Sequence, residues 1–192
     1  MTTTKFRATD IVVDLETLGT SNNAFITAIG AVAFNRHTGV IDRGGALDLS
    51  IDLASPGNGT LDTPTIKWWA TQDNAAFREA TQGTVDLRSA LRKFALWYTT
   101  LHDGACVWGH GPTFDNVILR NAFERNDIIW PASFRLDRCV RTIADVCTTA
   151  TDISPFDLVD FEGTRHVAVL DAIYEAQVIL KAFDLMKEAP VV

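Results

Sequence analysis

Short apolar runs separated by polar turns dominate the first fifty residues of the chain. Residues 11–17 form a β-branched run, residues 24–34 are almost wholly apolar, and residues 46–51 alternate apolar and polar side chains. Glycines and small polar residues fill the stretches between them, as is typical of turns. These patterns predict three strands in an antiparallel meander. Gly30, inside the second run, predicts a bulge or a close approach of another backbone segment.

From residue 62 onward the apolar spacing becomes helical. Two stretches repeat apolar residues at intervals of four, three, four and three, which predicts amphipathic helices over 84–101 and after residue 165. Their apolar residues are Leu87, Leu91, Phe94, Tyr98 and Leu101, and then Val169, Ile173, Ala176, Leu180 and Phe183. Further helices are predicted from Thr63, after Asp73, and over 114–126 and 140–149, with strands at 105–108 and 134–137. This order predicts an α/β fold with a mixed five-stranded sheet flanked by helices, its last two strands joined by helical crossovers.

Composition favours one globular domain over residues 1–192. Apolar residues make up 47% of the chain and charged residues 21%, which is typical of a protein with a packed core. The sequence contains no apolar run of the length that a membrane span needs, and its polar start lacks the features of a signal peptide. The three cysteines form no CxxC pair, so they predict reduced thiols in a cytoplasmic protein rather than a zinc site.

The net charge of −7 argues against a broad basic groove for a long phosphate backbone. Four carboxylates that held two divalent cations would change the net charge of the loaded protein to −7 + 4 = −3. The charge therefore allows a compact site that holds one chain end through its metals.

Two acids at the end of the first strand are the first candidates for such a site. Alternation along a strand places Asp14 and Glu16 on one face and Leu15 on the other. Two like charges side by side are costly to bury unless a cation neutralises them. The alternative is that both acids lie in a turn just past the strand, in contact with water.

Two later acids fall at the ends of predicted elements. Asp115 starts the helix that follows the fourth strand, where its alternative role is to cap that helix and interact with its dipole. Asp171 lies near the start of the last helix, five residues after His166, and both residues have ordinary solvent-exposed alternatives. Another histidine, His110, lies five residues before Asp115.

Taken together, the order DxE, D and HxxxxD resembles the DnaQ-like 3′→5′ exonuclease superfamily in its DEDDh branch, over about residues 10–187. Its motifs match DLET at Asp14, FDNVIL at Asp115 and the segment from His166 to Asp171. The DEDDy branch has a tyrosine four residues before the last acid, where this chain has Val167. Other segments are most similar to small exonucleases of phages and prophages and to related bacterial exoribonuclease-like proteins. Cys139 departs from that pattern, because an acid is expected there.

The resemblance implies a ribonuclease H-like fold and a metal-dependent exonuclease that releases 5′-mononucleotides from the 3′ ends of single-stranded nucleic acid. Two Mg²⁺ or Mn²⁺ ions would be held by Asp14, Glu16, Asp115 and Asp171. By the same resemblance Asp14 bridges both ions, Glu16 and Asp171 hold the nucleophile side, and Asp115 holds the leaving-group side. His166 is implied as the general base, a role that suits a histidine because it titrates near neutral pH. The HxxxxD spacing of the third motif favours His166 over His110. Family members often pair, which implies a homodimer.

Substrate contacts are less specific in the sequence. Thr17 and the amides near it are candidates to contact the terminal nucleotide, Leu18 to wedge against its base, and Phe114 to stack on a base. Core packing is the alternative for Phe114. Core positions are also expected for four of the tryptophans, and solvated positions for three arginines that are candidates for phosphate contacts. These residues are Trp68, Trp69, Trp97 and Trp108, and Arg120, Arg138 and Arg141.

Three alternative functions use the same residues. An exoribonuclease that acts on RNA or short oligoribonucleotides needs the same acids and histidine. The sequence does not distinguish it from a deoxyribonuclease, because it shows no pattern for recognition of the 2′-OH. A ribonuclease H-like endonuclease also assembles acids around two metals, although the HxxxxD segment argues against it. The last alternative is an inactive nucleic-acid-binding module on the same fold, and the intact set of acids and histidine argues against it.

Overall fold

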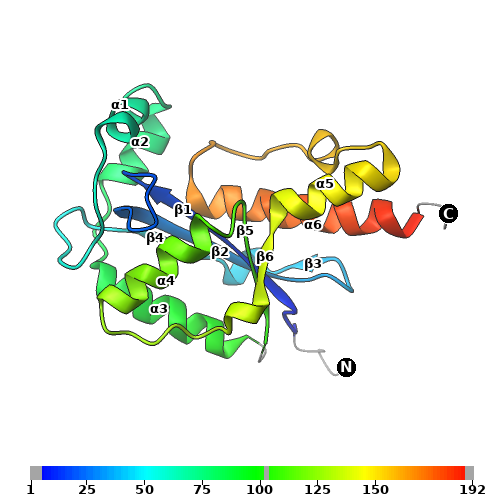
Figure 1. Cartoon of the computed structure of the whole chain (residues 1–192), viewed down its shortest axis with the longest axis horizontal. Helices are drawn as coiled ribbons and strands as arrows, with labels where there is room; N and C mark the ends of the chain where they lie inside the picture. The colour runs from blue at the N-terminus through cyan, green and yellow to red at the C-terminus, as the bar shows by residue number, and fades with distance from the viewer. Residues whose placement is uncertain (1–5, 102–103, 189–192) are drawn as a thin grey trace.

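A computed structural model describes residues 6–101 and 104–188 of the chain (Figure 1). The predicted domain of residues 1–192, including its polar start, therefore extends outside the described residues at both ends. The strands are β1 (Asp10–Thr17), β2 (Ile26–Asn35), β3 (Val40–Ile41), β4 (Leu47–Ser50), β5 (Cys106–Gly109) and β6 (Asp137–Cys139). The helices are α1 (Thr63–Trp69), α2 (Asn74–Thr81), α3 (Leu87–Thr100), α4 (Asp115–Arg125), α5 (Val140–Thr151) and α6 (Ala168–Glu188).

The strands form one mixed sheet with β1 near its centre. The order is β3-β2-β1-β5-β6, and β4 pairs with a different part of β2. β2 runs antiparallel to β1, whereas β5 and β6 are parallel to it. The predicted meander and the predicted parallel strands with helical crossovers are therefore confirmed.

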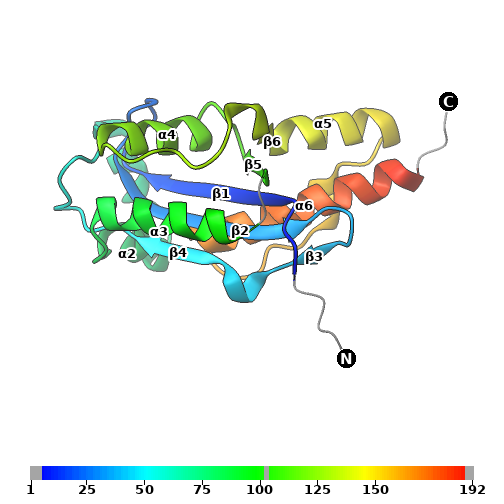
Figure 2. The same cartoon turned by 90° about the horizontal axis from the view of Figure 1, so that it is seen from below.

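Two layers of helices cover the sheet, and alternation along β1 decides which side chain meets which layer. Ile11, Val13 and Leu15 belong to one buried cluster with α3 and α4, whereas Val12 belongs to a second cluster with α5 and α6. Figure 1 shows these two helix pairs on opposite sides of the sheet, and Figure 2 shows α3 in front of the sheet with α6 behind it. Asp14, two residues after Val12, therefore belongs to the face that α6 covers.

The sheet differs from the predicted one at both edges. The two residues of β3 lie in the stretch predicted as a turn and form a sixth strand. This strand pairs with Phe34 and Asn35 of β2. At the other edge, residues 134–136 form a 3-10 helix, and the strand begins only at Asp137. Both strands are too short to show a clear alternation, so their sequence could not distinguish them from loops.

None of the helices in residues 6–101 and 104–188 has the length and apolar character needed to cross a bilayer. The three cysteines are free thiols, and Cys106 and Cys147 are buried. Cys139 is half-buried and caps α5, where its sulfur accepts a hydrogen bond from the Thr142 amide.

Candidate active site

A glycine in β2 allows the last helix to approach the acids of β1. Gly30 pairs directly with Asp14 across the antiparallel ladder. A Cβ atom at Gly30 would lie 2.1 Å from the carbonyl carbon of Ala168 and 2.3 Å from the Val169 nitrogen, far inside contact distance. The first turn of α6 therefore rests on the sheet at the position beside Asp14, and the close backbone approach predicted for this glycine is confirmed.

The turn before α6 brings His166 and Asp171 to the same place. The His166 amide donates a 2.7 Å hydrogen bond to Oδ2 of Asp171, which closes the turn. His166 has a φ of 64°, in the left-handed region that few residues other than glycine adopt. This backbone cost is offset by the hydrogen bond, and the pair fixes the histidine relative to the acid.

Asp115 reaches the site from the other helix layer. It is the first residue of α4 and is almost fully buried. Its Oδ1 accepts a hydrogen bond of 3.3 Å from the Leu15 amide, and its Oδ2 accepts one of 3.4 Å from the Gly111 amide. The strand before α4, β5, ends at Gly109. Through its hydrogen bond to Leu15, the Asp115 carboxylate contacts the backbone of β1 between Asp14 and Glu16.

One pocket of about 280 Å³, which we call the acid pocket, is lined by Asp14, Glu16, Asp115, His166 and Asp171. Ligand atoms of Glu16, His166 and Asp171 lie within 4.8 Å of one another. The structure thus brings together all the residues predicted as catalytic. The complete lining of the acid pocket is Asp14, Leu15, Glu16, His110, Gly111, Phe114, Asp115, Arg141, His166, Asp171 and Glu175.

The electrostatics of the acid pocket favour a cation. Removal from water, followed by the charges of Glu175, Glu16, Asp115 and Asp171, raises the pKa of Asp14 well above its ordinary value. Burial raises the pKa of Asp115 to about 6 and also raises that of Asp171. Clustered carboxylates are the hard oxygen ligands that Mg²⁺ and Mn²⁺ prefer, so the donor set fits divalent cations.

The raised pKa values predict that the metal-free protein is more stable at pH 5.5 than at pH 7.5. The pKa values of Asp115 and Glu175, about 6 and about 7, exceed those of the unfolded chain, so the folded chain binds more protons in this range. The pKa of His110 is raised by its hydrogen bond to Glu175, so its contribution is likewise lost as the pH rises. We expect a difference on the order of 2 kcal/mol, or roughly 4–8 °C in melting temperature.

Differential scanning fluorimetry in EDTA and in excess Mg²⁺ measures this effect. The cation neutralises the acids, so the melting temperature in Mg²⁺ should vary much less between the two pH values. A metal-free melting temperature that is equal at both pH values, or higher at pH 7.5, would contradict the prediction.

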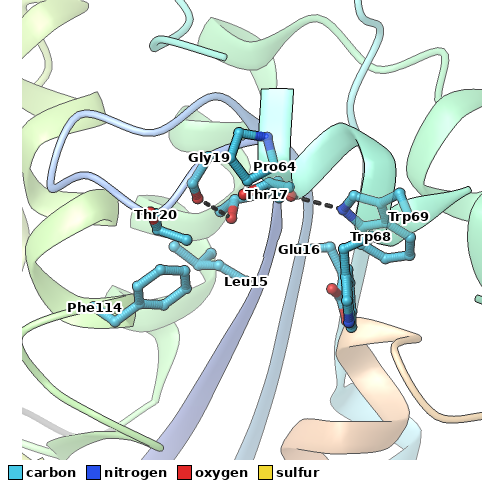
Figure 3. A pocket seen from close by; sticks show the side chains of 10 residues that line it. Leu15, Glu16, Thr17, Gly19, Thr20, Pro64, Trp68, Trp69 and Phe114 are labelled. Carbon is cyan, nitrogen blue, oxygen red and sulfur yellow. Dashed lines mark hydrogen bonds between the residues drawn. The ribbon is translucent and has the colours of Figure 1, made fainter. Parts of the chain in front are cut away.

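A second pocket of about 450 Å³, which we call the apolar pocket, adjoins the first. Leu15, Glu16 and Phe114 line both pockets. Figure 3 shows Phe114 on one side of the apolar pocket and Trp68 on the other. The remaining lining residues are Thr17, Gly19, Thr20, Pro64, Thr65 and Trp69.

Two neighbouring tryptophans of α1 have opposite environments. Trp69 is 1% exposed, as predicted, and its indole nitrogen donates a 2.8 Å hydrogen bond to the Thr17 carbonyl (Figure 3). Trp68 is 43% exposed, so the core position predicted for it is wrong. Its ring instead meets the His166 ring edge-on, with centroids 4.9 Å apart. Consecutive helix positions point about 100° apart, so in this short helix the Trp68 ring lies outside the core that the Trp69 ring enters.

The predicted substrate contacts lie at different depths. Phe114 is half-buried at the boundary of the two pockets. Thr17 lines the apolar pocket, and its hydroxyl donates a 2.7 Å hydrogen bond to the Gly19 carbonyl. Leu18 is 9% exposed and packs in a small cluster with Trp69, Ala76 and Ala80, so the structure places it behind the pocket wall.

The three arginines also differ. Arg120 donates a 2.7 Å hydrogen bond to Asp137, and Arg138 donates to the Arg135 carbonyl, so both are engaged away from the acid pocket. Arg141 lines the acid pocket, and its Nε donates to the His110 carbonyl.

Sequence reasoning missed one acid in the pocket. Glu175 lies four residues after Asp171, and its Oε1 lies 2.8 Å from Nδ1 of His110. The apolar residues on either side of it, Tyr174 and Ala176, are buried as it is. The only signal in the sequence was an acid between apolar positions of a buried helix.

Comparisons with known proteins give a matching family and several solved structures of similar fold. The family described as the 3'-5' exoribonuclease Rv2179c-like domain matches residues 9–183. A comparison with curated proteins gives no match. Among solved structures, the chain is similar to cell-death related nuclease 4 (CRN-4), with a TM-score of 0.70 and 14% identity, over 95% of this chain and 65% of that one. The chain thus spans less than two thirds of the length of CRN-4.

Two further solved structures are similar. One is the nuclease domain of 3'hExo, described as a DEDDh family member bound to rAMP, with a TM-score of 0.67, 11% identity and 98% of both chains covered. The other is S. pombe Pop2p in its Mg²⁺- and Mn²⁺-bound form, with a TM-score of 0.60, 12% identity, and 91% of this chain and 82% of that one covered. At these identities the likeness shows the fold, and it confirms the predicted ribonuclease H-like α/β class.

Proposed function

This chain belongs to the 3'-5' exoribonuclease Rv2179c-like domain family, and from that premise we propose that it removes 5′-mononucleotides from the 3′ ends of single-stranded RNA. The membership agrees with the DnaQ-like DEDDh motifs in the sequence, and the enzyme is a hydrolytic exonuclease. The observation that carries the proposal is the junction of the acid pocket and the apolar pocket at Leu15, Glu16 and Phe114.

The two pockets together match the two parts of a terminal nucleotide. The acid pocket suits the scissile phosphate, whose charge divalent cations neutralise when they are bound there. The apolar pocket suits the terminal base and sugar, between Trp68 and Phe114 (Figure 3). Its volume of about 450 Å³ is at the small end for ligand pockets and suits one nucleoside rather than several. This limit favours removal of terminal residues over internal cleavage.

We assign the roles in the acid pocket from the motifs and the positions of the side chains. Asp14, Glu16, Asp115 and Asp171 hold two divalent cations, Mg²⁺ or Mn²⁺. His166 takes the proton from the attacking water, because its ring lies beside Glu16 and Asp171 and its backbone is held by Asp171. His110 is less suited to that role, because its Nδ1 is engaged by Glu175.

RNA is the favoured substrate because the matching family is one of exoribonucleases. Single-stranded DNA is the second candidate, since the same acids serve both sugars. The sequence resemblance also implied a relation to phage exonucleases and a homodimer. The comparisons support neither, and neither forms part of the proposal. A cytoplasmic setting in a bacterial or phage-infected cell stays a prediction.

Digestion of 5′-labelled single-stranded RNA and DNA oligomers of one sequence tests the proposal. With Mg²⁺ or Mn²⁺ we expect a ladder that shortens from the 3′ end, faster on RNA than on DNA, and no ladder in EDTA. Faster digestion of DNA would transfer the assignment to the second candidate.

A circular single-stranded RNA is the matched control, because it has the same bonds and no end. It should stay intact while the linear oligomer is digested. Cleavage of the circle would indicate an endonuclease. No cleavage of either linear oligomer by folded, Mn²⁺-loaded protein would leave only the nucleic-acid-binding module.

A further inference from the structure

Glu175 is a buried acid that the four predicted metal ligands do not account for. It lies one helical turn after Asp171 on α6, and residues four apart share a face of a helix. Its side chain is 5% exposed and lines the acid pocket together with Asp14 and Asp115. Carboxylates are rarely buried to this degree unless they are paired or bind a cation.

The two oxygens of Glu175 have different surroundings. Oε1 lies 2.8 Å from Nδ1 of His110, a side chain that also lines the pocket. Oε2 is buried and has no hydrogen-bond partner among the described residues. A buried carboxylate oxygen without a hydrogen-bond partner destabilises the folded chain. A ligand that gives Oε2 a hydrogen bond or a positive charge would remove this cost and would therefore bind more tightly.

The charge of Glu175 acts on the centre of the site. Among the four acids that raise the pKa of Asp14, Glu175 has the largest effect, ahead of Glu16, Asp115 and Asp171. Burial raises the pKa of Glu175 itself to about 7, and its hydrogen bond to His110 opposes that rise. Glu175 and Asp14 line the same pocket, so a cation bound in that pocket would neutralise the negative charge of both.

We propose that Glu175 is a fifth carboxylate of the cation site, where His110 fixes its Oε1 and where its Oε2 would accept a hydrogen bond from water around a bound cation. The inference rests on the cation requirement of the proposed function. An outer position is favoured over direct ligation because Oε1 of Glu175 is already engaged by Nδ1 of His110, at 2.8 Å. Glu175 is thus a positioning residue, which orients the shell and adds negative charge.

Glu175→Gln tests this inference, because it keeps the shape of the side chain and removes its charge. The electron paramagnetic resonance signal of free Mn²⁺ measures how tightly the whole chain binds the ion. We expect the affinity for Mn²⁺ to become about 10- to 100-fold weaker, as is typical when a residue that supports the metal ligands is lost. The melting temperature in EDTA should rise, because a buried acid is removed from the pocket that Asp14 also lines. The matched control is Asp184→Asn on the same helix, where Asp184 is exposed and pairs with Lys187.

The opposite pair of results would overturn the inference. If Glu175 only supports the fold through His110, Glu175→Gln will unfold or melt at a lower temperature, and its Mn²⁺ affinity will match that of the natural chain wherever it folds. The RNA digestion assay separates this failure from failure of the proposed function. A natural chain that binds Mn²⁺ and digests RNA would keep the function even with Glu175 excluded, whereas one that does neither would refute the function itself.

Discussion

Replacement of Asp14 by Asn is expected to reduce the rate of RNA digestion by at least about a thousandfold. Asp14 is the acid whose pKa is raised by all of its acidic neighbours, so it lies where the negative charge of the pocket is concentrated. A cation held there contributes several kcal/mol of charge stabilisation, and about 4 kcal/mol corresponds to a factor of 10³ in rate. Asn keeps the shape of the side chain but loses the charge that holds the cation. Single-turnover digestion of a 5′-labelled RNA oligomer measures the loss.

The matched control is Asp48→Asn. Asp48 is an exposed acid on β4, which pairs with Gly30 on the side of β2 away from Asp14. Its variant should digest RNA at the natural rate. Asp14→Asn should melt at a higher temperature than the natural chain in EDTA, because it removes a charge from a crowded cluster. If Asp14→Asn kept more than a tenth of the natural rate, the role assigned to this acid would be wrong.

The part of the site on β1 could be predicted because alternation along a strand fixes the direction of each side chain. Val12 and Asp14 both face α6, as the period of two requires, and placing the two acids of the DLET motif, Asp14 and Glu16, needs no long-range information. The assembly of Asp115 and Asp171 beside them was predicted only from the family resemblance. Nothing in the local pattern indicates that a helix start from each layer meets at one end of the sheet.

The features that were missed depend on contacts between distant segments. Glu175 is an acid between two buried residues of α6, Tyr174 and Ala176, and its partner, His110, is 65 residues away in the sequence. Trp68 was predicted to be in the core because aromatic residues at helical spacing usually are, but Trp69 occupies the buried position and leaves Trp68 beside His166. The first environment depends on how α6 packs beside the loop after β5, and the second on how α1 packs against the end of β1, and a single sequence specifies neither.

Gly30→Ala is expected to separate the two halves of the site. The added Cβ would meet backbone atoms of Ala168 and Val169 rather than the flexible end of a side chain, so the start of α6 must move. His166 and Asp171 are attached to that turn and would move away from Asp14. Overpacking of this kind costs about 1–3 kcal/mol, or roughly 2–12 °C in melting temperature for a chain of this size. Because geometry at a reacting centre is sensitive to shifts of 1 Å, we also expect about a hundredfold loss in RNA digestion.

Thermal melting and single-turnover digestion of the same preparation measure both effects. Gly44→Ala is the matched control, because a Cβ there would have no heavy atom closer than 4.0 Å and its backbone has no positive φ. That variant should melt and digest RNA as the natural chain does. A folded Gly30→Ala with natural Mn²⁺ affinity and natural rate would show that α6 can shift without disturbing the acids. The assembly of the site would then depend on the pocket walls rather than on the contact between β2 and α6.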